Sequence, residues 1–123
     1  MGKIVQIDHI VLMFGDLQAS LPYYETLLPL IGFAKSRDHV WGNEAGVHLD
    51  LKQAEEIGEG YRRRGVGLNH IGFTAPSLAA VEAIAERMAE AGFEVPAIQD
   101  FGDAKALFMK DRDGIRFEIA YYP

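Results

Sequence analysis

Apolar and polar residues alternate along eight short segments of the chain, and such alternation is typical of β-strands that bury one face. These segments are 4–14, 33–38, 40–43, 47–52, 68–74, 95–99, 106–110 and 116–121. In two longer segments, 17–31 and 76–91, apolar residues recur at the spacing of one helix face. The pattern therefore predicts the order β-α-β-β-β twice in succession.

The predicted helices have recognisable ends. Asp16 is expected to cap the start of the first helix and Gly32 its end, because these residue types satisfy the free backbone groups there. Pro22 lies inside this helix, so we expect the helix either to kink there or to begin only at Ser20. Pro76-Ser77 opens the second helix.

The two halves of the chain also resemble each other in sequence. A histidine stands within an apolar, β-branched run in both Asp8–Leu12 and Asn69–Phe73, about 60 residues apart. The helix predicted after each run closes on Gly-Phe, at Gly32 and Gly92. One supersecondary unit therefore occurs twice.

The repeat extends to two carboxylates. Gly46–Leu51 matches Gly114–Ile119, which makes Asp50 the internal counterpart of Glu118. Counting alternate residues from the apolar positions puts four side chains on the face opposite the apolar one. They are His9, Asp50, His70 and Glu118. Two histidines and two carboxylates on one face predict a metal site.

Length and composition limit the fold and the chemistry. With 123 residues and 49% hydrophobic content, the chain is expected to be one domain over 1–123. Module one covers about 4–52, a polar linker about 53–67, and module two about 68–122. There is no cysteine, so any metal is bound by histidine, aspartate, glutamate or water.

The charge and hydropathy of the chain argue against nucleic acid and membranes as partners. The net charge is −6, and the only basic run, Arg62–Arg64, lies in the linker near several glutamates, where a solvated surface is the simpler reading. No apolar run approaches membrane-spanning length and no secretory signal pattern stands at the start. We therefore expect a cytoplasmic protein with a small-molecule substrate.

These motifs resemble the vicinal oxygen chelate superfamily, the glyoxalase, bleomycin-resistance and extradiol-dioxygenase group. The likeness covers nearly the whole chain, from Asp8–Leu12 through Asn69–Phe73 to the turn and strand Asp111–Glu118, where Arg112 replaces the usual proline. The resemblance implies an α+β fold of two tandem βαβββ modules that form a half-open, helix-backed curved sheet around a divalent metal ion.

The resemblance also implies a ligand set. The four ligands of the glyoxalase I branch carry over to His9, Asp50, His70 and Glu118. Asp50 is one methylene shorter than the family's glutamate, so it ligates directly, acts through a water, or leaves three ligands. The three-ligand set is the arrangement of non-haem iron oxygenases. The metal is zinc, nickel, cobalt, manganese or iron.

The ligand set and the resemblance leave three functions open. The first is a glyoxalase-like lyase or isomerase for a small vicinally oxygenated substrate, in which Glu118 or Asp50 shuttles a proton. The second is an extradiol-type Fe(II) or Mn(II) dioxygenase that cleaves catechol rings. The third is a binding protein that sequesters a small molecule such as a drug, and the histidines together with Glu118 count against it.

Further side chains are candidates for substrate contact, and the family suggests an oligomer. Lys52 and Arg116 either hold an anionic substrate or pair with the neighbouring carboxylates. The other candidates are His48, Trp41 and Phe101. The linker allows modules to pair between chains, and the resemblance makes such swapping common, so we expect a homodimer with shared sites.

Overall fold

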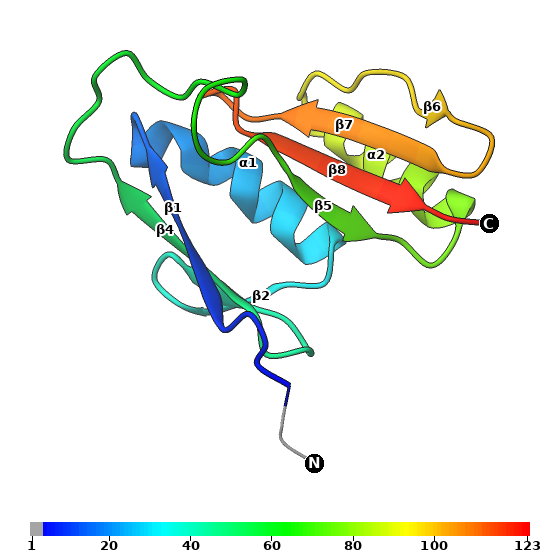
Figure 1. Cartoon of the computed structure of the whole chain (residues 1–123), viewed down its shortest axis with the longest axis horizontal. Helices are drawn as coiled ribbons and strands as arrows, with labels where there is room; N and C mark the ends of the chain where they lie inside the picture. Colours follow the sequence, from blue (N-terminus) through cyan, green and yellow to red (C-terminus); the bar gives the residue numbers. More distant parts are fainter. Residues whose placement is uncertain (1–3) are drawn as a thin grey trace.

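The computed structural model describes residues 4–123 and contains two helices and eight strands in the predicted order (Figure 1). Module one comprises β1 (His9–Phe14), α1 (Leu17–Leu30), β2 (Ala34–Arg37), β3 (Val40–Gly42) and β4 (His48–Gln53). Module two comprises β5 (Ile71–Thr74), α2 (Leu78–Glu90), β6 (Gln99–Asp100), β7 (Lys105–Lys110) and β8 (Arg116–Tyr121). The segment 54–70 between them forms neither helix nor strand.

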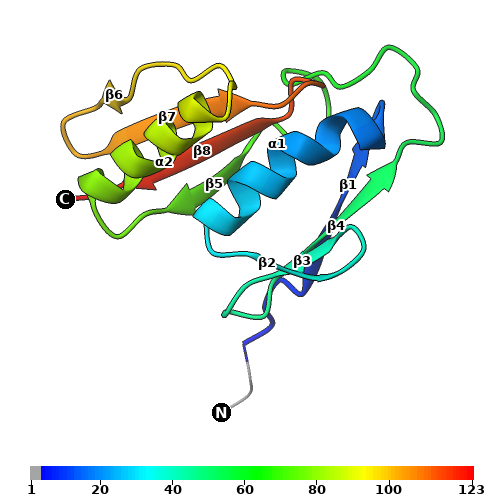
Figure 2. The same cartoon turned by 180° about the vertical axis from the view of Figure 1, so that it is seen from behind.

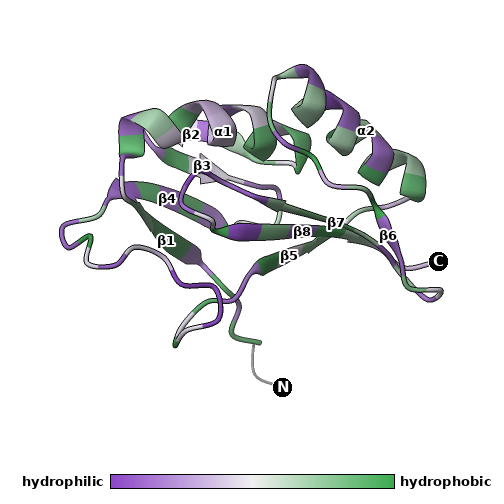
Figure 3. Cartoon of the chain, turned by 90° about the horizontal axis from the view of Figure 1, so that it is seen from above, coloured by the Kyte–Doolittle hydropathy of each residue, from purple (hydrophilic) through white to green (hydrophobic). Residues whose placement is uncertain are grey.

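Each module folds into a four-stranded mixed sheet. The strand orders are β1-β4-β3-β2 and β5-β8-β7-β6, so corresponding strands occupy corresponding places. Both helices cover the same side of the two sheets, and the other side is left uncovered (Figures 2 and 3). We call this uncovered side the open face. The predicted α+β fold with a half-open, helix-backed sheet is confirmed.

The helices end as the sequence predicts. Asp16 accepts a hydrogen bond from the Ala19 amide at 3.1 Å, and α1 begins directly after it. Gly32 has a φ of 93°, and the Phe33 amide bonds back to the Leu28 carbonyl at 2.9 Å. This Schellman motif recurs at Gly92, where φ is 94° and the Phe93 amide bonds to Met88. The repeat is therefore reproduced in the backbone.

Some predicted boundaries were wrong. Residues 4–8 are not part of β1, since its register with β4 starts at His9 opposite His48 and a turn precedes His48. The Asp8 carbonyl accepts a hydrogen bond from the His48 amide at 2.9 Å, but residues 4–8 do not form a strand. The strand expected over 95–99 shrinks to Gln99–Asp100, which pairs with β7 at two positions. Pro22 does not delay α1, which begins at Leu17.

One core joins the two modules. Tyr24 of α1 packs against Phe14 at 4.9 Å and against Phe117 of β8 at 5.7 Å between ring centroids. Phe33 meets Phe73 at 6.1 Å in the same way. Because Phe73 and Phe117 belong to module two, whereas Tyr24 and Phe33 belong to module one, neither module buries its apolar face without the other.

A buried carboxylate reinforces this junction. Asp111, in the turn before β8, accepts a hydrogen bond of 2.5 Å from the Tyr24 hydroxyl and another of 2.8 Å from the Ile115 amide. Burial raises the pKa of Asp111 above its ordinary value, although the bond from Tyr24 acts in the opposite direction. Asp113 of the same turn accepts from the Gly15 amide, which lies at the end of β1.

No helix within residues 4–123 combines the length and the apolar character needed to cross a bilayer.

Candidate metal centre

Equivalent strand registers place each histidine near a carboxylate. In module one β1 runs parallel to β4, with Val11 opposite Asp50, two residues after His9. In module two β5 runs parallel to β8, with Gly72 opposite Glu118, again two residues after the histidine. The carboxylates project on the open face, because their strand neighbours are buried on the helix side.

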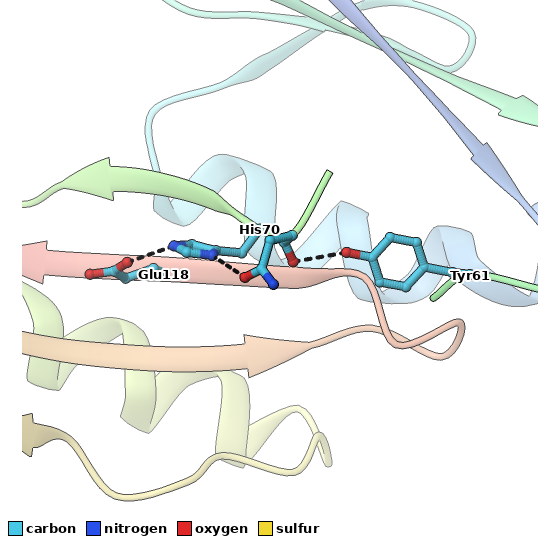
Figure 4. A network of polar contacts seen from close by, with 4 residues as sticks. Tyr61, His70 and Glu118 are labelled. Carbon is cyan, nitrogen blue, oxygen red and sulfur yellow. Dashed lines mark hydrogen bonds and ion pairs between the residues drawn. The ribbon is translucent and has the colours of Figure 1, made fainter. Parts of the chain in front are cut away.

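The module-two pair is in direct contact. His70 Nε2 lies 3.0 Å from Glu118 Oε1, and the side chains are 36% and 20% exposed (Figure 4). The other ring nitrogen, Nδ1, is 2.7 Å from Oδ1 of Asn69. Tyr61 fixes the backbone here, because its hydroxyl donates to the carbonyls of Leu68 and Asn69 at 2.6 and 2.8 Å.

The module-one pair is more open. His9 Nδ1 lies 2.7 Å from Asp8 Oδ2, and the His9 side chain is 59% exposed. His9, His48 and Asp50 line one hollow of about 300 Å³ with Asp8, Arg37 and Val40. Lys52 Nζ lies 3.7 Å from Asp50 Oδ2. Gly42 makes room for the His48 ring, since a Cβ there would lie 2.9 Å from two of its atoms.

The two pairs do not meet within one chain. Among residues 4–123, no three histidine, aspartate or glutamate side chains converge where a metal ion can be held. The strand directions explain this: β1 and β5 point in opposite senses (Figure 1), and the end of β1 lies near the turn before β8, where Asp113 accepts a hydrogen bond from the Gly15 amide. His9, at the start of β1, is thus about 20 Å along the strand from that junction.

Comparison with known proteins identifies the family. A family model for the Glyoxalase/Bleomycin resistance protein/Dioxygenase superfamily matches residues 6–119. The chain belongs to this superfamily. It is also 30% identical to the protein YqjT of Bacillus subtilis (strain 168) over 92% of this chain and 96% of that protein.

Solved structures of the superfamily share the fold. A putative glyoxalase from Bacillus halodurans superimposes with a TM-score of 0.80 at 21% identity, over 94% of each chain. A glyoxylase/bleomycin resistance protein/dioxygenase domain from Frankia sp. EAN1pec gives a TM-score of 0.78 at 21% identity, over 98% of this chain and 100% of that one. At this identity the likeness establishes the fold alone.

The other residues that were predicted to contact the substrate lie in different parts of the structure. Arg116 lies on the open face with its guanidinium carbon 4.8 Å from the centroid of the Phe108 ring. Trp41 is 6% exposed and packs in the core. Phe101 is 55% exposed, in the loop after β6. Neither Trp41 nor Phe101 lines the hollow beside His9, and a substrate contact by either stays a prediction.

Two residues that orient the histidines were not predicted from the sequence. Asp8 and Asn69 each precede a histidine and each contact its Nδ1 at 2.7 Å. The signal was present in the repeat, because Asp8-His9 and Asn69-His70 align residue for residue. A partner at Nδ1 decides which ring nitrogen of the histidine is free to bind a metal ion.

A hollow on the helix side has a lining unlike that of the open face. It measures about 530 Å³ and is lined by the end of α1, one face of α2 and parts of β5 and β8, including Ile31, Phe73 and Ile84. Arg87 is its one charged lining residue. The hollow lacks a histidine or carboxylate, so the open face remains the candidate metal centre.

Proposed function

We propose that this protein is a divalent-metal-dependent, glyoxalase-like lyase or isomerase that acts on a small vicinally oxygenated substrate. The observation that carries the proposal is the contact between His70 Nε2 and Glu118 Oε1 at 3.0 Å, together with its repeat equivalent, His9 and Asp50. Superfamily membership supports the same class of chemistry.

The donor chemistry of the His70 pair fits a metal ion. The Oδ1 atom of Asn69 can only accept, so the proton of a neutral His70 sits on Nδ1 and Nε2 carries a lone pair. That lone pair and the carboxylate of Glu118 repel unless a cation or a proton lies between them. An imidazole nitrogen and a carboxylate oxygen are both ligands of divalent ions, so Nε2 of His70 and Oε1 of Glu118 would hold such an ion together.

The same logic applies to His9. Asp8 is an acceptor when ionised, so it holds the proton of His9 on Nδ1 and leaves Nε2 to ligate. His9, Asp50, His70 and Glu118 would hold the ion. When bound, the ion polarises a substrate carbonyl and stabilises the negative charge that develops on its oxygen. An oxygen of Glu118 or Asp50 then moves a proton between neighbouring carbons.

We further propose that the site forms between two copies of the chain. Each module offers one histidine–carboxylate pair, and the hollow that His9 and Asp50 line does not include His70 or Glu118. A second hollow of about 560 Å³, between β1 and the linker, is lined by Val11, Met13, Val66 and Leu68, all exposed apolar residues. A second copy that covers this patch removes it from water and joins module one of one chain to module two of the other.

Metal analysis of protein purified without a polyhistidine tag tests the proposal. We expect about one divalent ion per chain in the wild type and a loss of that ion in His70→Ala. The control is His39→Ala, since His39 is a half-buried turn residue outside both pairs. Full occupancy in His70→Ala, or no metal in metal-replete wild type, would contradict the proposal.

One contact favours a second function, an extradiol-type dioxygenase. The ion pair between Lys52 and Asp50 at 3.7 Å competes with ligation by Asp50. Without Asp50, the ligands are His9, His70 and Glu118, a set of two histidines and one carboxylate that suits Fe(II). Iron bound in the purified protein, with oxygen uptake in the presence of catechols, would select this function over the first.

A further inference from the structure

A small basic hollow lies on the open face of module two, beside His70 and Glu118. It measures about 230 Å³, and β7 and β8 form much of its wall. Phe108 is in register with Glu118, and Lys110 is in register with Arg116, so these side chains share one face. We call this the basic hollow and define it by Arg63, Glu94, Phe108, Lys110 and Arg116.

The charge of the basic hollow contrasts with that of the chain. Three of its lining residues are cationic, and Glu94 is the one carboxylate among them, which leaves two positive charges uncompensated. The chain as a whole carries a net charge of −6. Within residues 4–123, the ion pairs formed do not include Arg63, Lys110 or Arg116. A positive hollow in an acidic protein attracts a dianion.

Arg116 lies over an aromatic ring and keeps hydrogen-bond donors for an oxyanion. Its guanidinium carbon lies 4.8 Å from the centroid of the Phe108 ring, and the Phe108 ring in turn lies 6.1 Å from that of His70. A guanidinium that lies over a ring keeps its N–H groups available, and two of them can donate parallel hydrogen bonds to one oxyanion.

Lys52, the other cationic candidate on the open face, behaves differently. Its ammonium group is already 3.7 Å from Asp50 in module one. Arg116 does not pair with its neighbour Glu118 in this way, because Glu118 contacts His70. The available cationic groups of the open face are therefore gathered on one side of the His70 pair.

The volume of the basic hollow and the distance between Arg116 and Glu118 indicate which ligand fits. At about 30 Å³ per water molecule, the basic hollow holds roughly seven waters, which is enough for a phosphoryl group and the atoms attached to it. Arg116 precedes Glu118 by two residues on the same strand face, a distance of about 6.7 Å. A phosphoryl group bound by Arg116 thus places atoms three or four bonds away at Glu118.

We infer that the basic hollow binds a phosphoryl group and that the substrate of the proposed metal site is a small phosphorylated compound with vicinal oxygens. The second part rests on the proposed function, whereas the first part does not. Lys110 and Arg63 supply charge, and Arg116 supplies two directed hydrogen bonds.

Calorimetric titration of metal-free protein with inorganic phosphate tests the first part. The protein is treated with a chelator so that phosphate cannot bind through a metal ion, and the buffer holds 0.15 M salt to screen diffuse attraction. We expect one phosphate per chain in the wild type, bound about tenfold or more weakly by Arg116→Ala and by Lys110→Ala. Arg87→Ala is the matched control, since it removes the same charge from the helix side.

The results of this titration either support or overturn phosphate binding in the basic hollow. Loss of binding in Arg116→Ala and Lys110→Ala, with unchanged binding in Arg87→Ala, supports the basic hollow. Absence of phosphate binding in the wild type, or equal binding in all variants, overturns it. Lys110 is exposed, so Lys110→Ala keeps the fold even if Arg116→Ala does not. Acetate that binds as tightly as phosphate would overturn the phosphoryl assignment in favour of any oxyanion.

A second titration tests the link to the metal site. Dihydroxyacetone phosphate has vicinal oxygens beside a phosphoryl group, so metal-loaded wild type should bind it more tightly than it binds inorganic phosphate. His70→Ala should lose this gain and still bind phosphate. Absence of a gain in metal-loaded wild type overturns the substrate class. If the wild type holds no metal, phosphate binding stands and the proposed function fails alone.

Discussion

Removing the hydroxyl of Tyr24 should weaken the junction between the two modules. In Tyr24→Phe the ring keeps its contacts with Phe14 and Phe117, and only the hydrogen bond to Asp111 at 2.5 Å is lost. A hydrogen bond to a charged, buried group contributes roughly 1.5 to 3 kcal/mol. We expect the free energy of unfolding to fall by about 2 kcal/mol at pH 7, and Tm to fall by roughly 5 to 10 °C.

The loss should depend on pH with a defined sign. Burial raises the pKa of Asp111 from its ordinary value of 3.8, so the folded state holds this proton more tightly than the unfolded state does. The stabilising effect of the buried acid is present at low pH and is lost as pH rises through the raised pKa. The bond from Tyr24 favours the ionised form, so Tyr24→Phe raises that pKa further. The difference between variant and wild type should therefore be smaller at pH 4 than at pH 7.

Urea unfolding at both pH values, at one fixed protein concentration, measures this effect. Tyr23→Phe is a matched control on the same helix, because the Tyr23 hydroxyl is buried and has no hydrogen-bond partner among the described residues. Its loss should leave stability unchanged or slightly increased. The reasoning is refuted if Tyr24→Phe costs no more than Tyr23→Phe at pH 7, or if the cost is larger at pH 4.

Three further predictions concern the site and the repeat. Asn69→Ala should weaken metal binding roughly 10- to 100-fold in a competition with a chelating dye, because His70 loses the partner that orients it; an unchanged affinity would remove Asn69 from the site. Asp50→Asn should weaken metal binding about as much as Glu118→Gln if Asp50 is a direct ligand, and a much milder effect at Asp50 would favour the pairing with Lys52. Gly92→Ala should lower the free energy of unfolding by about 1 kcal/mol in thermal unfolding, since its φ of 94° is strained for any other residue; no loss would show that the Schellman turn relaxes.

The sequence predicted the fold because local patterns and the repeat agree. Asp16, Gly32 and Gly92 determine helix ends through short-range hydrogen bonds, which a sequence reveals directly. The start of β1 was wrong because it depends on the length of its partner β4, and the sequence of residues 4–8 carries no record of that length. Tertiary pairing decides such boundaries.

The sequence predicted which residues belong to the candidate site, but not how the fold arranges them in space. Alternation identified the face of Glu118 and Asp50, because side-chain direction in a strand has a period of two. It gave no means of seeing that His9 and His70 lie apart in one chain, since that depends on the opposite directions of β1 and β5 (Figure 1). Nor did it find the basic hollow. Arg63 comes from a run that reads as solvated linker, and only the folded chain brings it beside Lys110.

The central claim is that one metal site is built by two chains. Co-expression of a His9→Ala chain and a Glu118→Ala chain, carrying two different tags that do not bind metal, allows the mixed dimer to be isolated. One of its sites then combines both defects, and the other joins intact His9 and Asp50 to intact His70 and Glu118. We predict one metal ion of wild-type affinity per mixed dimer and none in either homodimer. Mixed dimers without such a site, or a chain that proves monomeric with metal bound, would contradict the account.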